Sequence, residues 1–316
     1  MSIPDFRYKQ NRLQQLRGFC YAAQAGSISK AAKRLFLSQP SVSLQIKALE
    51  RELECVLFER RGPKIRLTPD GEALLELALP MVESMDSLEE EFAARRNMPE
   101  HGRLDIAAGQ STILYILPKY VEKFVTDYPA IDLRLHSVTG RQGMEQLRAG
   151  EVDFAFGPML QSYEDIVYFP VFSYDTVLIT ALGHPLTKKK HVTIKDISAY
   201  PLILPPRELT TYRIVDAVFR RHNLPYEVKL EAGGYEVIKK YVGMGLGVSI
   251  VSSVCVSDAY SPKRGRHPGG RDKLAVIPVG RHFPKRTYGV VLRRGKVLSP
   301  QSKRFIKLMD PTIKDL

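Results

Sequence analysis

A run of polar side chains between residues 38 and 47 has the composition needed to contact DNA. An apolar stripe at helical spacing, from Val42 to Leu53, predicts a helix whose opposite face is exposed. Exposed hydroxyl, amide and amine groups can hydrogen-bond to base edges and phosphates. We expect the DNA-binding residues of this helix to be Ser38, Gln39, Pro40, Ser41, Ser43, Gln45 and Lys47. The alternative is an amphipathic helix with an ordinary solvated face.

A basic hairpin is expected directly after this helix. Residues 58–68 alternate apolar and basic side chains around Gly62 and Pro63, which is typical of two short strands and a turn. With Ile65 and Leu67 facing inward, the basic side chains face outward and can lie along a phosphate backbone. The expected phosphate contacts are Arg60, Arg61, Lys64 and Arg66.

The elements that position these residues can be read from capping signals. Residues 12–58 have helical periodicity, interrupted at residues 25–27 and at residues 37–38. Ser27 or Ser29 can cap one short helix, and Ser38 can cap the next, with Pro40 tolerated in its first turn. Three helices followed by a hairpin predict a winged helix-turn-helix.

A second group of hydroxyl, amide and glycine residues follows the predicted strands of the C-terminal region. In open α/β sheets, ligands bind beyond the carboxyl ends of strands, where helix N-termini offer N–H groups to anions. We expect an effector site from Gln110, Ser111, Thr112, Thr139, Gly140, Thr210, Thr211 and Gly233. Taken singly, each Ser or Thr fits a simple N-cap equally well.

Motifs for catalysis or metal binding are missing from the sequence. There is no GxSxG elbow, Walker loop or HxxxH pair, and Cys20, Cys55 and Cys255 lie far apart. We therefore expect no enzyme, no metal and no cofactor, only a small-molecule effector. The alternative functions are an enzyme and a solute-binding module without DNA function.

The net charge of +13 favours a nucleic-acid partner, but the basic residues concentrate at both ends of the chain. Residues 1–68 hold 13 Lys and Arg against 5 Asp and Glu, and residues 260–316 hold 15 against 3. Charge alone therefore does not locate the DNA site, and the basic C-terminal region is left without an assigned role.

Three regions follow from these patterns: a DNA-binding domain over residues 1–68, a linker helix over 69–98 and an effector domain over 99–316. Strands and helices alternate as βαβαβ from residue 103 and again from residue 201, which predicts an α/β domain of two lobes. Lobe I is expected at about residues 99–180 and 284–316, and lobe II at about 181–283. The fold class is thus multidomain, an all-α winged helix-turn-helix and linker followed by α/β lobes.

The linker helix, starting at Thr68 and Pro69, has an apolar seam on an otherwise acidic surface. Spacings of four and three residues are typical of a coiled-coil seam. The expected dimerisation residues are Leu74, Ala78, Met81, Met85, Leu88 and Phe92. Packing of this helix on its own domain is the alternative, and Pro80 is expected to bend it.

The segment AGSISKAAKRLFLSQPSVSLQIKALERELECVLFERRGPKIRLTPDGEALL, with Leu16 and Phe19 before it, resembles the LysR-type transcriptional regulator family. The resemblance continues through ILPKYVEKFVTDYP, GEVDFAFGP, ALGHPL and GMGLGVSIV. It implies a winged helix-turn-helix, a dimerising linker helix and an effector domain similar to periplasmic binding proteins. GQSTILYILP and YEVIKKYVGMGLGV are similar to the CysB-like branch, which implies sulfate-like anionic effectors contacted by Ser111, Thr112, Thr139 and Thr210.

The expected partners are double-stranded DNA, a second copy of the chain as homodimer or homotetramer, a small anionic metabolite and RNA polymerase. No membrane partner is expected, because no run approaches the ~18 apolar residues of a span. The N-terminal residues lack the apolar segment of a signal peptide, which favours a cytoplasmic location.

Overall fold

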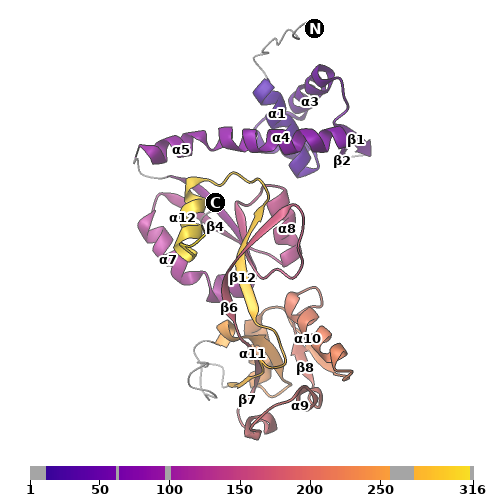
Figure 1. The fold of residues 1–316 in the computed structure, drawn as a ribbon, viewed down its shortest axis with the longest axis vertical. Coiled ribbons are helices and arrows are strands. Elements are labelled where there is room, and N and C mark those ends of the chain that lie inside the picture. Colours follow the sequence, from indigo (N-terminus) through magenta and orange to yellow (C-terminus); the bar gives the residue numbers. More distant parts are fainter. Residues whose placement is uncertain (1–11, 62–63, 97–100, 257–273, 314–316) are drawn as a thin grey trace.

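The computed structural model describes residues 12–61, 64–96, 101–256 and 274–313 as a head, a helical linker and two lobes (Figure 1). The head contains α1 (Arg12–Ala25), α2 (Ile28–Arg34), α3 (Gln39–Leu53) and the antiparallel strands β1 (Phe58–Arg61) and β2 (Lys64–Leu67). Side chains such as Phe19, Val42 and Leu49 form its core. The expected three helices and hairpin are confirmed.

The linker is helical along its described length, as expected, and is divided into two consecutive helices only at Ser87, where the Ser87 amide still donates to the Glu83 carbonyl at 3.0 Å. Helix α4 (Pro69–Asp86) starts as expected, capped by the Thr68 hydroxyl, and continues through Pro80. Helix α5 (Leu88–Arg95) follows a break at Ser87, whose Oγ donates to the Ser84 carbonyl at 3.3 Å. A hydroxyl that bonds back to the preceding turn loosens a helix there. The expected end at residues 97–99 lies outside the described residues.

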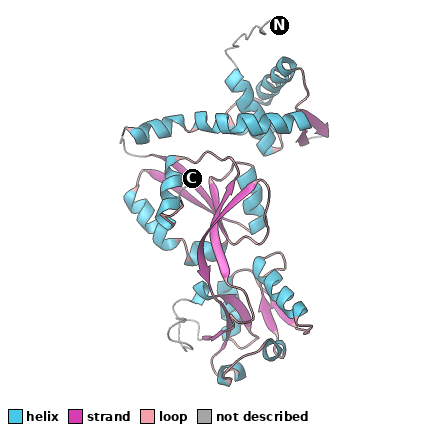
Figure 2. Cartoon of the chain, viewed as in Figure 1, coloured by secondary structure: helices cyan, strands magenta, loops and turns pink. Residues whose placement is uncertain are grey.

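Lobe I is built on a five-stranded sheet of order β4-β3-β5-β12-β6, covered by helices on both faces (Figure 2). Its first three strands are parallel, whereas β12 runs antiparallel to both of its neighbours. The first βαβαβ run is therefore confirmed. The strands are β3 (Gly102–Ala108), β4 (Ile131–Ser137), β5 (Phe154–Gly157), β6 (Ile166–Tyr174) and β12 (Arg286–Arg293), and the helices are α6 (Gln110–Tyr115), α7 (Pro118–Asp127), α8 (Gly140–Arg148) and α12 (Pro300–Met309).

Lobe II departs from a simple second βαβαβ run. Strands β8 and β9 pair in parallel as expected, but β10 pairs with β7 in the antiparallel sense. Strand β10 finds this partner because β7 arrives from lobe I beside it and β11 closes the other edge of the three-stranded sheet. The elements are β7 (Thr176–Ala181), η1 (Pro185–Lys188), α9 (Ile194–Ser198), β8 (Leu202–Leu204), α10 (Thr210–Arg221), β9 (Val228–Glu231), α11 (Tyr235–Gly243), β10 (Ser249–Ser252), η2 (Ser253–Val256) and β11 (Leu274–Pro278).

The chain crosses between the lobes twice. The first crossing was expected near residue 180, but Thr176 already pairs with Ser252 of lobe II, so the crossing lies at Asp175. The second crossing lies between Pro278 and Arg286 and includes the expected position. The long strands β6 and β12 pair along their length and form the connection to lobe II (Figure 2).

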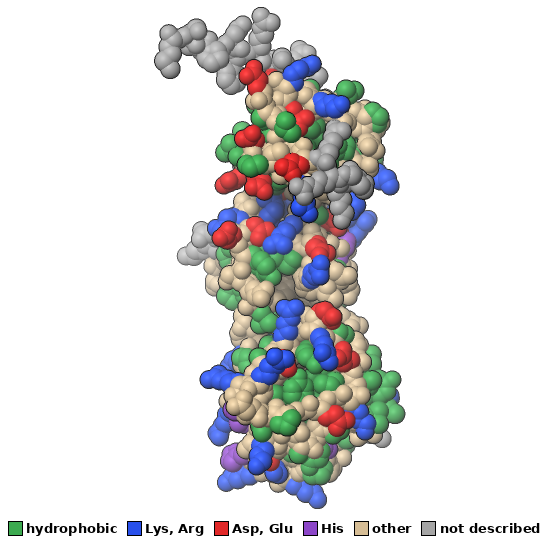
Figure 3. Space-filling view, turned by 90° about the vertical axis from the view of Figure 1, so that its right-hand side faces the viewer, with side chains coloured by type: hydrophobic (Ala, Val, Ile, Leu, Met, Phe, Trp, Pro, Cys, Tyr) green, Lys and Arg blue, Asp and Glu red, His purple; other side chains and the backbone are tan. Residues whose placement is uncertain are grey.

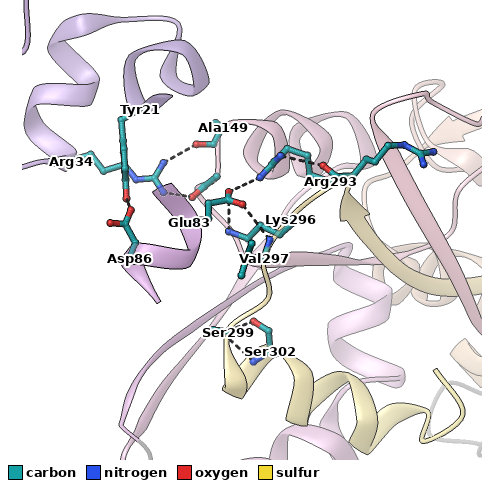
Figure 4. A network of polar contacts seen from close by, with 12 residues as sticks. Tyr21, Arg34, Glu83, Asp86, Ala149, Arg293, Lys296, Val297, Ser299 and Ser302 are labelled. Carbon is teal, nitrogen blue, oxygen red and sulfur yellow. Dashed lines mark hydrogen bonds and ion pairs between the residues drawn. The ribbon is translucent and has the colours of Figure 1, made fainter. Parts of the chain in front are cut away.

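The head and α4 contact lobe I through polar groups (Figure 4). The two Nη atoms of Arg34 donate to the carbonyls of Ala149 and Gly150, at 2.9 and 2.7 Å, where α8 ends. The Glu83 carboxylate accepts from Arg293 Nη2 at 2.5 Å and from the Val297 amide at 3.3 Å. Two separate polar contacts therefore hold the head and α4 against lobe I.

Candidate functional site

Helix α3 is capped and buried as the sequence predicts. The Ser38 Oγ accepts from the Ser41 amide at 3.2 Å, and Pro40 lies in the first turn, where its missing N–H costs nothing. The inward side chains Val42, Ile46 and Leu49 are at most 3% exposed. The helix is thereby fixed against the head, and its opposite face is left to solvent.

The exposed face of α3 repeats every three to four residues. Pro40, Leu44, Lys47 and Arg51 are exposed along its length. Ser38 and Gln39 are exposed at its start, and the Gln39 Oε1 accepts from the Ser29 hydroxyl at 2.9 Å. Sequence reasoning missed Leu44 and Arg51, although both lie opposite the buried stripe at helical spacing.

Gln45, one of the predicted DNA-binding residues, packs its side chain against α1. Its Oε1 would lie 2.7 Å from a Cβ at Gly18, so the side chain fills the space that this glycine leaves between the helices. The Gln45 Oε1 is buried without a hydrogen-bond partner among the described residues, so the DNA-binding role expected for this half-buried side chain stays a prediction. Ser41 and Ser43 are half-buried at the flanks of the exposed face. Leu53, expected inside, is 36% exposed at the last turn.

The hairpin forms with the expected register. Arg60 pairs with Ile65 and Arg61 with Lys64, and the Arg66 side chain is exposed. Ile65 packs against the head core, as predicted for an inward residue. The side chains of Arg60, Arg61 and Lys64 lie outside the described part of the structure.

The apolar seam of the linker divides into a buried part and an exposed part. Ala78 is 3% exposed because α4 packs that face against α1, so Ala78 is not available to a partner. Leu74 is half-buried in the same core. An exposed apolar stripe runs along the opposite face, and its side chains are 47 to 72% exposed: Leu77, Met81, Met85, Leu88 and Phe92. The sequence alone did not predict Leu77 as part of this stripe.

The predicted effector residues lie on both sides of the junction between the lobes. Gln110, at the start of α6 in lobe I, reaches Gly234, at the start of α11 in lobe II, where a Cβ would lie 2.5 Å from its Oε1. Thr112 is 1% exposed and Thr211 is 4% exposed. The structure thus brings the starts of these helices together across the junction.

The remaining predicted effector residues are accessible but have local roles or no described polar contact. Thr139 forms a capping box with Gln142 at the start of α8, and Gly140 is the first residue of that helix. Ser111 and Thr210 are half-exposed, and Gly233 is exposed beside the cap of α11. Thr139 therefore fits the N-cap alternative as well as it fits a ligand contact.

Arg286 is the charged centre of this junction, and sequence reasoning missed it. It is the first residue of β12 and only 7% exposed. Its Nη1 donates to the Thr211 Oγ1 at 2.6 Å, and that hydroxyl also bonds to the Tyr235 hydroxyl. Within the described residues no carboxylate lies within ion-pair distance of Arg286. The hydrogen-bond partner of this buried guanidinium among the described residues is therefore a neutral hydroxyl.

Several buried polar atoms of α6 and β12 lack a hydrogen-bond partner among the described residues. They are the Thr112 Oγ1, the Tyr115 hydroxyl and the Arg286 Nε. Buried polar groups are nearly always paired in folded proteins, with ordered water or a ligand where protein partners are missing. These atoms come from α6 in lobe I and from the strand that returns from lobe II.

Two ionisable groups beside Arg286 stay uncharged. Burial raises the pKa of the Tyr235 hydroxyl and raises the pKa of the Cys255 thiol to about 12, although Arg286 and Lys239 lower the latter. Both groups therefore remain protonated at neutral pH. Lys239 is also buried and lies 5.2 Å from the centre of the Tyr115 ring, and the Glu236 carboxylate pairs with its Nζ at 2.7 Å. Lys239 is thus balanced within α11, whereas the charge of Arg286 has no carboxylate beside it among the described residues.

Basic charge does not single out one surface of the molecule. Figure 3 shows Lys and Arg side chains on the head and on both lobes. Among the described residues, no group of three or more His, Cys, Asp or Glu could hold a metal ion. In the same residues, no helix combines the length and apolar character needed to cross a membrane.

Comparison with known proteins identifies both parts of the chain. Residues 13–72 match the bacterial regulatory helix-turn-helix model of the lysR family, and residues 98–312 match the LysR substrate binding domain. The HTH-type transcriptional regulator CysB of Burkholderia cenocepacia is 31% identical over 99% of this chain and 94% of its own length.

Solved structures agree with these matches. Full-length OxyR from Pseudomonas aeruginosa has a TM-score of 0.69 at 24% identity, covering 94% of this chain and 93% of that one. Full-length CbnR, solved with its target DNA, has a TM-score of 0.55 at 25% identity, covering 96% and 99%. The chain therefore belongs to the LysR family of DNA-binding transcriptional regulators, in the branch that resembles CysB.

Proposed function

We propose that this regulator responds to a small oxyanion, such as sulfate, that binds between its lobes with Arg286 as the counter-charge. The observation that carries the proposal is the buried guanidinium without a carboxylate partner. An isolated buried charge is costly, and an anion bound beside it removes that cost. The resemblance of GQSTILYILP and YEVIKKYVGMGLGV to the CysB-like branch favours a sulfate-like anion.

The proposed contacts combine predicted and newly found residues. Thr112 supplies an unpartnered hydroxyl from lobe I, and Thr211 supplies a hydroxyl already held by Arg286 from lobe II. Because these groups lie on different lobes, an anion between them favours one arrangement of the lobes. Ser111, Thr139, Thr210 and the glycines at Gly140 and Gly233 complete the proposed rim of the site.

The test replaces the counter-charge and measures binding of inorganic sulfate and thiosulfate by calorimetry. Arg286→Gln should abolish binding, and Thr211→Val should weaken it by about tenfold, since a hydrogen bond to a charged group is worth ~1.5–3 kcal/mol. The matched control is Arg207→Gln, an exposed arginine of lobe II paired with Glu231. Equal anion affinity in Arg286→Gln and Arg207→Gln would refute the site.

We infer that the exposed stripe of the linker forms a homodimer or a higher homo-oligomer, which presents two heads to DNA. We propose that it acts on chromosomal DNA in the cytoplasm. Contact with RNA polymerase stays a prediction. Genome-wide footprinting of bound DNA tests the action on chromosomal DNA, and the regulated genes also indicate the effector.

A further inference from the structure

The exposed face of α3 contains one large apolar side chain among polar and basic ones. Leu44 is 67% exposed, between Pro40 on one turn and Lys47 on the next. It lies opposite the stripe of Val42 and Ile46 that anchors the helix. A leucine in this position contributes little to the core of the head, so its exposure calls for a partner outside the head.

We propose that Leu44 contacts the C5-methyl group of a thymine in the operator and thereby contributes to sequence specificity. The second helix of a helix-turn-helix lies in the major groove, with its N-terminal part toward the base edges. Leu44 lies in the second turn of α3 and so belongs to that part. The thymine methyl is the apolar group that the major groove offers to such a side chain.

The surroundings of Leu44 favour DNA over a protein partner. Lys47 and Arg51 are exposed on the same face and match phosphates on either side of the groove. Gln39, near the start of the helix, has an amide suited to adenine. This inference concerns the head alone and does not depend on the proposed anion site.

The experiment removes the methyl group from the DNA and the side chain from the protein. An operator is first selected from random DNA with the full-length protein, and each thymine is then replaced singly by deoxyuridine. At one thymine in each half-site, replacement by deoxyuridine should lower the affinity of the wild-type protein for the operator about fourfold. This is the effect expected from burying one methyl-sized group. Leu44→Ala should bind the thymine operator more weakly and should not distinguish thymine from uracil at that position.

Two control variants separate this role from general effects. Val56→Ala shortens another exposed aliphatic side chain of the head, 62% exposed and beyond the end of α3, and should keep the thymine preference. Lys47→Ala should weaken binding to thymine and uracil operators equally. Thermal unfolding of Leu44→Ala should match the wild type.

Three results would overturn the proposal. The wild-type protein could bind the operator with unchanged affinity whichever thymine is replaced by deoxyuridine. Alternatively, Leu44→Ala could lose as much affinity on that replacement as the wild type does. A loss of self-association in Leu44→Ala, with unchanged operator affinity, would instead assign the side chain to a protein contact.

Discussion

At the scale of single residues, Phe36 has a backbone conformation that favours glycine. Helix α2 ends with the Leu37 amide donating to the Ala32 carbonyl at 2.9 Å and the Phe36 amide to the Lys33 carbonyl at 3.3 Å. This pattern is a Schellman motif, which places Phe36 at a φ of 54°. The Phe36 side chain is 96% exposed, so packing within the described structure does not offset the strain.

We expect Phe36→Gly to stabilise the head by about 1 kcal/mol. Relief of the left-handed conformation contributes ~1–2 kcal/mol, and the greater freedom of glycine in the unfolded chain removes ~0.5–1 kcal/mol. Urea unfolding followed by circular dichroism measures the difference. Leu37→Gly, at the next position, is the control and should destabilise; a gain of the same size there would contradict the explanation.

Sequence reasoning finds residues whose role depends on local geometry and misses those that depend on topology. Ser38 and Thr68 are predictable as caps because a helix start leaves N–H groups unpaired nearby. Arg286 reaches Thr211 from 75 positions away, and nothing in the spacing links them. The packing of Gln45 against Gly18 of another helix is likewise not predictable from its spacing.

At the scale of elements, patterns of period and capping predict most boundaries of the head and lobe I. The same patterns do not show which strand pairs with which, so the second βαβαβ run is only partly correct. Strand β10 pairs with β7, which comes from the first crossing between the lobes. The division between α4 and α5 is one residue long, at Ser87, and has no strong sequence signal.

The exposed apolar stripe of the linker predicts self-association. Met85→Lys with Leu88→Lys places two charges in the stripe, and burying an unpaired charge is strongly unfavourable. We expect sedimentation to show a shift from oligomer to monomer. Val125→Lys changes a similarly exposed apolar residue of α7, at 43%, and should leave the mass unchanged. An unchanged mass for the double variant would show that the stripe is not the interface.

At the scale of the whole molecule, the sequence predicts a head, a linker and two lobes but not how the head docks. The docking contacts join Arg34 to the end of α8 and Glu83 to the segment after β12. Such contacts are few, polar and distant in sequence, so periodicity and composition give no sign of them.

Strand β12 connects the proposed anion site to this docking contact. Arg286 begins the strand in the lobe junction, and Arg293 ends it beside Glu83. The strand pairs with β5 on one side and with β6 on the other, so both arginines lie on one braced element. A ligand that moves Arg286 relative to lobe I would act on the element that also holds α4.

Glu83→Gln should therefore loosen the head from lobe I. The Glu83 and Arg293 side chains are 12% and 14% exposed, and removing one partner of a buried pair costs ~3–5 kcal/mol. Glutamine retains an acceptor, so we expect the lower part of this range, seen as faster hydrogen exchange of the Val297 amide that donates to Glu83.

The control is Glu52→Gln, since Glu52 is 14% exposed and pairs with Arg12 inside the head. If β12 couples the two sites, Glu83→Gln should also change the affinity for sulfate, because coupling between two sites is reciprocal, whereas Glu52→Gln should not. Equal exchange at Val297 in both variants would show that the Glu83 contact does not hold the head, and unchanged sulfate affinity would show that β12 does not couple it to the lobe junction.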